Sequence, residues 1–443
     1  MRLPPLVVSI PCLALVVQLV CRVGLIASDD LGYARFAAQI ANGTFHPELH
    51  HYAFRYGLTV PVAVVYRLAG VQEWSTVLIP LLASCASVAL LVHLAERLGG
   101  RVAAGIAGVL YATFPVQVHH ATILVPEPVA EMFALAAIAV YWRALERGSA
   151  RFGGIAGILL GCGFLAKEPA FFIALAVGLH GLVQRRWSVV AGLLTGAALV
   201  GAGELAYHAL AAGDPLLRLR GNALHEVSPM ALAANEDLTY RLFKAYPRMM
   251  LVPAQEFGIH SLVALPLALL GWWWCPRPQR GLLQLWTVLP WVYINFGSSS
   301  FDHFFALPVA PRYIEFTYPP LFVLCGIALA RMGSAGRGRQ WLVAGLVAAT
   351  AAGGVYGSLR WQDRVPRIET VRELRRVAVE LRNRRAARIA VEQPPEPAGT
   401  QVKARWARTA AILLPGVEIV VDPQRADAVV EVRADGSVAV RWR

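Results

Sequence analysis

The sequence predicts an all-α polytopic membrane protein of about eleven transmembrane helices, followed by a small α/β domain at the C-terminus. Three observations support this fold class. Hydrophobic residues make up 57% of the 443 positions and charged residues only 16%, a balance that soluble multidomain proteins do not show. The apolar residues fall into runs long enough to cross a hydrocarbon core, separated by short polar breaks. After residue 358 the composition changes to charged, amphipathic segments.

Hydropathy predicts each transmembrane helix to within a few residues. The spans are 5–26, 75–95, 101–119, 122–143, 154–167, 170–184, 188–209, 258–275, 281–297, 312–331 and 340–358. Segment 57–70 is apolar but too short to span, and a helix lying at the membrane interface is expected there. A cleaved signal peptide is the alternative for the first run, but this run is longer than a typical signal core, and three prolines, Pro4, Pro5 and Pro11, lie at its start or within it.

The orientation follows from arginines that occur in every second break. They are Arg97 and Arg101, Arg143, Arg147 and Arg151, Arg185 and Arg186, Arg277 and Arg280, and Arg331, Arg337 and Arg339. By the positive-inside rule these breaks are cytoplasmic. The intervening breaks, which include a first outer loop at 27–74 and a long outer loop at 210–257, then face the extracytoplasmic side. The sequence therefore predicts an integral protein of the cytoplasmic membrane of a bacterium, in contact with membrane lipids.

The tail 359–443 is predicted to be separate from the transmembrane domain, 1–358. It begins with an arginine-rich helical pattern at 366–384 and ends in strand-like runs at 410–422, 427–436 and 437–443. Because the eleventh helix exits outward, this small α/β domain is expected to be extracytoplasmic. A solvated packing role fits it better than a catalytic one, since it shows no nucleophile-base pattern and no glycine-rich phosphate loop.

The net charge of +13 does not indicate a nucleic-acid partner. Many of the positive residues are the orientation signals just described, and no basic helix with interleaved aromatics occurs. The six cysteines lie in or beside apolar spans, without metal-type spacing and without a disulfide framework. These observations exclude the usual signatures of nucleic-acid-binding and disulfide-rich proteins.

Ionisable residues gather on the predicted outer side. They are Asp29, Asp30, His50, His51, Arg55, His119, His120, Glu127, Glu131, Lys167, Glu168, Asp302, His303 and Arg312. Such groups near membrane depth usually face a protein cavity or water, so a reaction chamber is expected at the outer interface. A transporter would more naturally place its key charges near the midplane in repeated halves, and no internal repeat is found.

Five stretches resemble, in order, landmarks of the GT-C glycosyltransferases, in the branch of protein O-mannosyltransferases and bacterial aminoarabinose transferases. They are SDDLGYARFAAQIANG, FRYGLTVPVAVVYRLAG, ATILVPEPVAEMFALAAIAVYWRAL, GILLGCGFLAKEPAFF and PRYIEFTYPPLFVLCGIALA. The resemblance implies a GT-C-like fold and transfer of a sugar from a polyprenyl-phosphate donor to a lipid, glycan or protein acceptor on the outer face. It also implies an acidic pair in the first outer loop.

Asp29 and Asp30 match that acidic pair. An acceptor hydroxyl is a poor nucleophile, and a carboxylate within hydrogen-bond reach can accept its proton during attack on the anomeric carbon. Asp29 is therefore predicted to be the general base, with Asp30 positioning the acceptor or helping to bind a cation. The alternative for Asp30 is a helix N-cap, because an aspartate at the start of LGYARFAAQI can satisfy free amide donors.

Three cations are predicted to bind the donor phosphate: Lys167, Arg312 and Arg55. A departing polyprenyl phosphate gains negative charge, which preorganised cations stabilise. Lys167 interrupts an apolar hairpin and matches the family's lysine, although it could instead snorkel and pair with Glu168. Arg312 could equally be an interfacial anchor.

The remaining candidate cavity or acceptor residues are Glu127, Tyr33, His51 and His120. The chain departs from the family pattern at Gly32, where arginine is frequent, and at Arg55, where aminoarabinose transferases tend to have an acidic residue. No cofactor is required. A divalent cation is possible, because His50, His51, His119 and His120 could join Asp30 or Glu127, although their spacing is not diagnostic. A flippase or transporter of a lipid-linked sugar is the main alternative, and a membrane scaffold the third.

Overall fold

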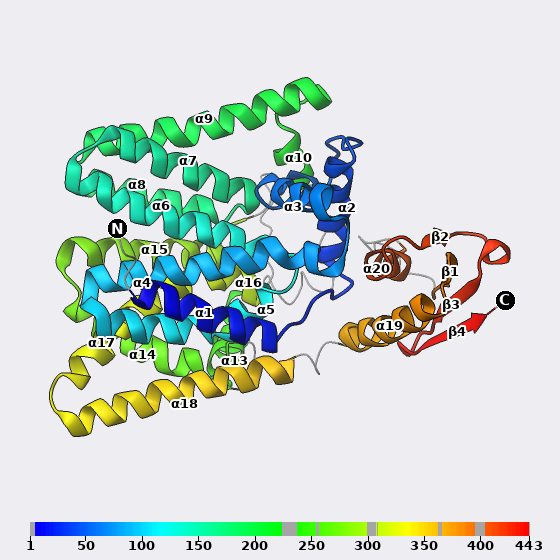
Figure 1. Cartoon of the computed structure of the whole chain (residues 1–443). Helices are drawn as coiled ribbons and strands as arrows, with labels where there is room; N and C mark the ends of the chain where they lie inside the picture. The colour runs from blue at the N-terminus through cyan, green and yellow to red at the C-terminus, as the bar shows by residue number, and fades with distance from the viewer. Residues whose placement is uncertain are drawn as a thin grey trace.

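The computed structural model describes residues 5–223, 237–253, 257–298, 307, 309–361, 366–394 and 404–442. A bundle of long helices forms most of the molecule, and a smaller unit of helices and a sheet lies against one end of it (Figure 1). This arrangement confirms the predicted fold class of a helical membrane protein with a small C-terminal α/β unit.

The predicted spans all contain helix. The bundle helices are α1 (Pro5–Val20), α4 (Glu73–Ala112), α5 (Pro115–His120), α6 (Glu127–Arg147), α7 (Ala150–Ala166), α8 (Ala170–Val183), α9 (Trp187–Ala212), α14 (Gly258–Trp274), α15 (Arg277–Phe296), α17 (Tyr318–Gly333) and α18 (Arg337–Trp361). Within the described residues, five helical runs are long and apolar enough to cross a membrane: 73–112, 127–147, 187–212, 311–333 and 337–361. Several other apolar helices, including α1, α7 and α14, are shorter.

Helix α4 contains the predicted span 75–95 and the first part of the predicted span 101–119, the end of which lies in α5. The backbone leaves helical geometry at Gly100, where φ is 78°, a conformation that glycine adopts without a steric penalty. The two halves then fold back and pack closely against each other. A Cβ on Gly108 in the second half would lie only 2.5 Å from the Val92 side chain in the first half. The turn between them carries Arg97 and Arg101, two of the predicted orientation signals.

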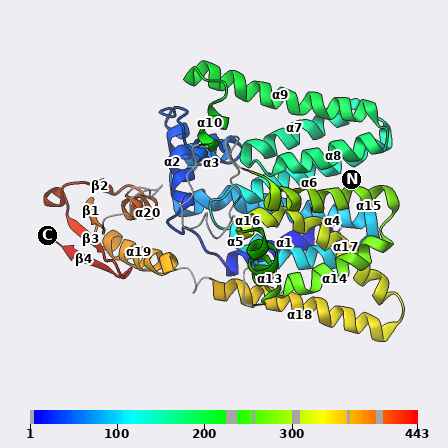
Figure 2. The same cartoon turned by 180° about the vertical axis from the view of Figure 1, so that it is seen from behind.

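The arginine-rich breaks lie together at one end of the bundle. Arg97 pairs with Glu146, which joins the turn inside α4 to the end of α6. Arg331 lies over the ring of Trp274, which joins the end of α17 to the end of α14. The other end carries α2 (Asp29–Ala41) and the C-terminal unit, as the two opposite views show (Figures 1 and 2).

Short helices cover this second end. Helix α2 runs across the ends of the bundle helices, and η1 (His51–Phe54), α3 (Tyr56–Ala69) and α10 (Leu217–Ala223) lie beside it (Figure 1). Helix α3 corresponds to the predicted interfacial segment 57–70. Its exposed apolar side chains, Val60, Val64 and Leu68, recur every four residues, so they form one apolar stripe suited to a membrane interface.

The long loop 210–257 is partly helical. Helix α9 continues to Ala212, and α10 follows it. Further along, α12 (Leu238–Tyr240), the π-helical turn η2 (Arg241–Ala245) and α13 (Tyr246–Leu251) lead to α14. Residues 224–236 and 254–256 are outside the described part of the chain, as are Asp302 and His303 of the predicted outer polar set.

The C-terminal unit contains α19 (Pro366–Asn383), β1 (Arg388–Glu392), α20 (Arg405–Leu413), β2 (Glu418–Val420), the 3-10 turn η5 (Pro423–Arg425), β3 (Ala428–Val432) and β4 (Val438–Trp442). The strand order is β2-β1-β3-β4. Strand β1 is parallel to both β2 and β3, while β3 and β4 form an antiparallel pair.

Two details of this unit differ from the sequence prediction. Residues 410–413 were expected to begin a strand but belong to α20, because Trp406, Ala410 and Leu413 recur at helical spacing and pack inward. Strand β1 was not predicted. Only five residues long, it carries little local signal, and the burial of Ile389 and Ala390 depends on neighbouring strands from later in the chain.

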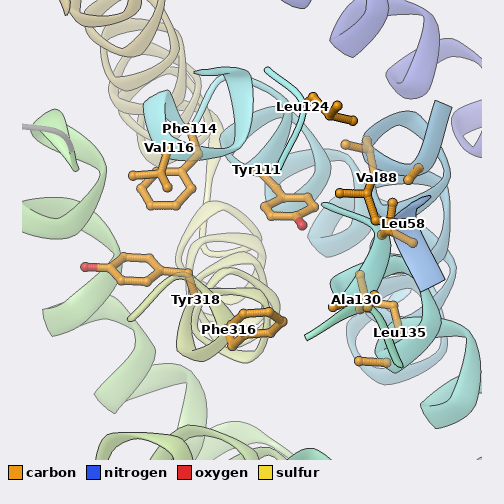
Figure 3. Packing of buried hydrophobic residues seen from close by; sticks show 14 of the residues in the cluster. Leu58, Val88, Tyr111, Phe114, Val116, Leu124, Ala130, Leu135, Phe316 and Tyr318 are labelled. Carbon is orange, nitrogen blue, oxygen red and sulfur yellow. The ribbon is translucent and has the colours of Figure 1, made fainter. Parts of the chain in front are cut away.

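An aromatic cluster fixes the start of α17 against the middle of the bundle. Phe114, just after α4, stacks on Tyr318 at the start of α17, with ring centroids 4.8 Å apart and planes at 20°. Figure 3 shows these two rings with Tyr111 and Phe316 in the same packed layer. This packing also helps to position Arg312, one of the predicted phosphate-binding residues. Arg312 lies on α16 (Pro311–Ile314), only six residues before Tyr318.

Candidate functional site

A polar cavity of about 240 Å³ opens at the end of the bundle that carries α2. Its lining residues are Asp29, Tyr33, His51, Arg55, Glu127, Lys167, Glu168, Pro169, Leu219, Asn222, Tyr293, Ser298, Leu307, Arg312 and Tyr313. These residues come from segments spread along most of the chain. The fold therefore brings the acid Asp29 and all three predicted phosphate-binding cations to one cavity.

Asp29 is the first residue of α2 and faces the cavity. Its Oδ1 accepts a hydrogen bond from the Tyr52 hydroxyl at 2.7 Å, and its Oδ2 accepts one from Arg312 Nη1 at 2.7 Å. Burial alone would raise the pKa of Asp29, but the Arg312 guanidinium and the Tyr52 hydroxyl outweigh it and hold the pKa below its usual value. Asp29 is consequently ionised at neutral pH.

Asp30 is fully buried and is not among the residues that line the cavity. Its Oδ1 accepts from the Ser28 amide at 2.6 Å and its Oδ2 from the Ile26 amide at 2.8 Å. Ser28, not Asp30, occupies the N-cap position of α2, and the two carboxylate oxygens of Asp30 bond amides of the preceding loop. Burial raises the pKa of Asp30 to about 6, although these amides oppose the shift.

Each predicted phosphate-binding cation already has a carboxylate partner. Lys167 pairs with Glu127, Arg312 with Asp29, and Arg55 with Glu168. The alternative in which Lys167 snorkels and pairs with Glu168 is wrong, since Lys167 is 5% exposed and its partner is Glu127. Lys167 also lies 4.8 Å from the centre of the Tyr313 ring.

Glu168 joins the cavity to the long loop. In addition to Arg55, it accepts hydrogen bonds from Arg218 at 3.0 Å and from Asn222 at 3.1 Å, both on α10. Burial opposes ionisation of Glu168, but Arg55 and Arg218 hold its pKa well below the usual range. Arg218 is itself buried and also bonds Glu204 of α9 at 2.7 Å.

Sequence reasoning missed several residues that line or support the cavity: Tyr52, Arg218, Asn222, Tyr293 and Tyr313. Tyr52 carried a usable signal, because it adjoins His51 in the first outer loop. Arg218 stood in a loop that was recognised as unusually long, but nothing local distinguishes it from the exposed Arg220 two positions later.

The histidines separate into different surroundings. His51 lines the cavity together with Tyr33. His120 does not line it and instead contacts Glu315 through Nδ1 at 2.6 Å. His119 stacks on Trp361 with centroids 4.2 Å apart. Across the described ranges, no three His, Cys, Asp or Glu side chains are grouped as metal ligands, so the histidine cation site suggested by the sequence is not assembled in this structure.

An apolar groove of about 580 Å³ lies beside the polar cavity. It is lined by Ile40, Gly43, Phe45, Tyr56, Val60, Leu165, Val200, Gly203, Glu204 and Tyr207. Tyr56 and Leu165 are close in sequence to Arg55 and Lys167 of the cavity. Arg218 links the two spaces, because it bonds both Glu204 of the groove and Glu168 of the cavity.

Comparisons with known proteins agree with this architecture. Residues 61–203 match the family model described as dolichyl-phosphate-mannose-protein mannosyltransferase. The fold is similar to ArnT from Cupriavidus metallidurans in the apo state, with a TM-score of 0.64 and 15% identity over 96% of this chain and 92% of that chain. ArnT bound to undecaprenyl phosphate gives a TM-score of 0.56 at 14% identity over 96% and 93%.

A more distant likeness is to the oligosaccharyltransferase of Archaeoglobus fulgidus, with a TM-score of 0.51 and 12% identity over 94% of this chain and 63% of that chain. A comparison with curated proteins found no match. The chain therefore has the fold of membrane glycosyltransferases of the GT-C type. Within that class, the family model and the ArnT-like fold support the mannosyltransferase and ArnT branch indicated by the sequence.

Proposed function

We propose that this protein transfers a sugar from a polyprenyl-phosphate donor to an acceptor hydroxyl at the extracytoplasmic face of the membrane. The observation that supports this most is the convergence of Asp29, two further carboxylates and three buried or half-buried cations on a single cavity beside an apolar groove. The ArnT-like fold and the family match over residues 61–203 support glycosyl transfer as the chemistry of this site.

Asp29 is the general base in this proposal. The acceptor oxygen attacks the anomeric carbon, the bond between that carbon and the phosphate oxygen breaks, and the hydroxyl proton passes to Asp29. Arg312 and Tyr52 hold the carboxylate in one orientation, which reduces the cost of organising the reacting groups. Asp30 instead accepts hydrogen bonds from amides of the loop that leads to Asp29, which is consistent with its position outside the cavity.

Lys167, Arg312 and Arg55 receive the phosphate. The lining side chains include three acids, Asp29, Glu127 and Glu168, whose charges balance those of these three cations. A bound phosphodiester would share the cations with their carboxylate partners. As the departing phosphate gains charge, these preorganised cations stabilise it in surroundings that contain little water.

The apolar groove suits the isoprenoid chain of the donor. It is open, and both Val60 and Tyr207 on its walls are partly exposed where the surrounding membrane would lie. A chain lying there would reach the polar cavity near Arg55 and Lys167. The charged and apolar parts of a lipid-linked sugar would thus each meet matching surroundings.

A transfer assay tests the proposal and separates it from the flippase alternative. Purified protein in detergent is incubated with radiolabelled polyprenyl-phosphate sugars and with extracted lipid, glycan and protein acceptors. Label transferred to an acceptor supports the enzyme. Labelled donor that crosses a vesicle bilayer without any transfer would support the flippase instead.

The extracytoplasmic placement of the cavity predicts a labelling pattern. In a cysteine-free background, cysteines at Asn42 and Gln424, both exposed at the α2 end of the molecule, should react with a membrane-impermeant thiol reagent in cells with a permeabilised outer layer. A cysteine at Ala335, in the arginine-rich break between α17 and α18, should be protected until the inner membrane is opened. The opposite pattern would place the cavity in the cytoplasm.

A further inference from the structure

The loop that leads into Asp29 is held by hydrogen bonds to the helical bundle and to the C-terminal unit. Residues 21–28 lie between α1 and α2, and their amides bond the turn before α6: the Val23 amide to Thr122 Oγ1 and the Gly24 amide to the Thr122 carbonyl, both at 3.0 Å. At its far end, the loop presents the Ile26 and Ser28 amides to Asp30. Any shift of this loop therefore moves the start of α2, and with it Asp29.

The C-terminal unit makes the second set of hydrogen bonds to this loop. Arg375 of α19 donates from Nη2 to the Val23 carbonyl at 3.1 Å. The same guanidinium binds the Glu73 carboxylate at the start of α4, with its shortest contact at 2.5 Å. Near the end of the loop, Arg367 donates to Ser28 Oγ at 3.3 Å. One arginine thus ties the loop, the first turn of a long bundle helix and the C-terminal unit together.

The backbone at Gly24 passes very close to this contact. Gly24 has a φ of 77°, and a Cβ there would lie 2.3 Å from Glu73 Oε1 and 2.6 Å from Arg375 Nη2. The positive φ favours glycine, and a Cβ at this position would displace the ends of the Glu73 and Arg375 side chains. The ion pair therefore lies directly against the backbone of the loop.

An apolar contact accompanies the charged one. Ile368 of α19 is buried with Val23 of the loop and with Ile123 and Val125 of the turn before α6. Val125 lies two residues before Glu127, the partner of Lys167. The C-terminal unit consequently packs on the two segments that lead to Asp29 and Glu127, both of which line the cavity.

We propose that Arg375 is a positioning residue. Through it the C-terminal unit holds the loop 21–28 and so keeps Asp29 at the correct position relative to the donor-binding cations. The inference rests on the proposed function for its effect on transfer, but its structural part stands on the contacts alone. A C-terminal unit that merely adheres to the bundle would affect stability without a selective effect on the chemical step.

The test compares Arg375→Gln with Arg376→Gln. Arg376 is the next residue on α19, is exposed and pairs with Glu373 on its own helix, which makes it a matched control. Hydrogen exchange of peptides covering 22–30 should be faster in Arg375→Gln than in the wild type, while peptides from α7 and α9 stay unchanged. Transfer by Arg375→Gln should show a kcat lower on the order of 10-fold with an unchanged donor KM, since small misplacements of a reacting group reduce rate more than binding.

Arg375→Lys gives a milder second variant. A lysine keeps the charge but lacks the fork that serves Glu73 and Val23 together, so its exchange rate and kcat should fall between those of the wild type and Arg375→Gln. The inference is overturned if Arg375→Gln shows the same exchange and kcat as Arg376→Gln, or if only the donor KM changes. Should the wild-type protein show no transfer at all, the proposed function fails, and the exchange comparison still decides whether Arg375 holds the loop.

Discussion

Asp29→Asn is expected to lower turnover by about 10²–10⁴-fold, the range typical of losing a general base, while the protein remains folded and inserted. Asparagine is nearly isosteric, and its one carbonyl oxygen can still accept from Arg312 while its amide group donates to the Tyr52 hydroxyl, but it cannot take a proton from the acceptor. Arg312 is 38% exposed at its side chain, so loss of its ionic partner leaves it partly hydrated and does not disrupt the fold. The measurement is single-turnover transfer under saturating donor.

Two comparisons make this prediction specific. Asp30→Asn should reduce turnover less than Asp29→Asn, because Asp30 holds loop amides and does not line the cavity. A base works only when deprotonated, and the pKa of Asp29 lies below its usual value of 3.8, so the wild-type rate should show no acid limb from this group until the pH falls below about 4. Near-normal transfer by Asp29→Asn would remove it from the role of base.

Lys167→Ala should have the second large effect, on both binding and rate. The lysine charge both holds the donor phosphate and stabilises the leaving group, so the donor KM should rise and kcat should fall together. The same change leaves Glu127 buried without its partner, and breaking a buried pair in this way costs about 3–5 kcal/mol of stability. Thermal unfolding in detergent, together with steady-state kinetics over a range of donor concentrations, measures the two effects.

The double variant Lys167→Ala with Glu127→Gln separates these consequences. Removing the stranded charge should recover much of the lost stability, because a neutral amide is less costly to bury than a carboxylate. It should not recover donor binding. Lys167→Arg should restore KM better than kcat, since the guanidinium keeps the charge but is broader than the ammonium. If the double variant regained both stability and normal kinetics, Lys167 would be only a structural partner of Glu127.

Much of the helical framework was predictable because hydropathy is a local property. A run of apolar residues can be placed in a membrane without knowledge of the rest of the chain. The predicted span 75–95 and the first part of the predicted span 101–119 form the two halves of α4, which fold back at Gly100, and the second span ends in α5. Residues 410–413 show where prediction from local sequence fails, because a strand was expected there and the structure has a helix. Apolar runs of that length suit a strand or a helix equally well, and packing against the small sheet selects the helix.

The candidate site was also predictable in part. The order of the motifs and a family resemblance indicated that Asp29, Lys167, Arg55 and Arg312 act together, and the fold places all four on one cavity. Their pairing was not predictable. Arg55 is 113 positions from its partner Glu168, and Lys167 binds Glu127, 40 positions away, although Glu168 is its neighbour in sequence.

The sequence by itself determined that this chain is a helical membrane protein with a small C-terminal unit, and it indicated the acidic pair and the cations. Both kinds of information lie in residue type and short-range order. Only the tertiary structure decided which of the two aspartates faces the cavity, which carboxylate each cation contacts, and that Arg375 reaches the loop before Asp29. Such contacts depend on the approach of segments as far apart as Asp29 and Arg312, 283 positions along the chain, and no local pattern encodes that approach.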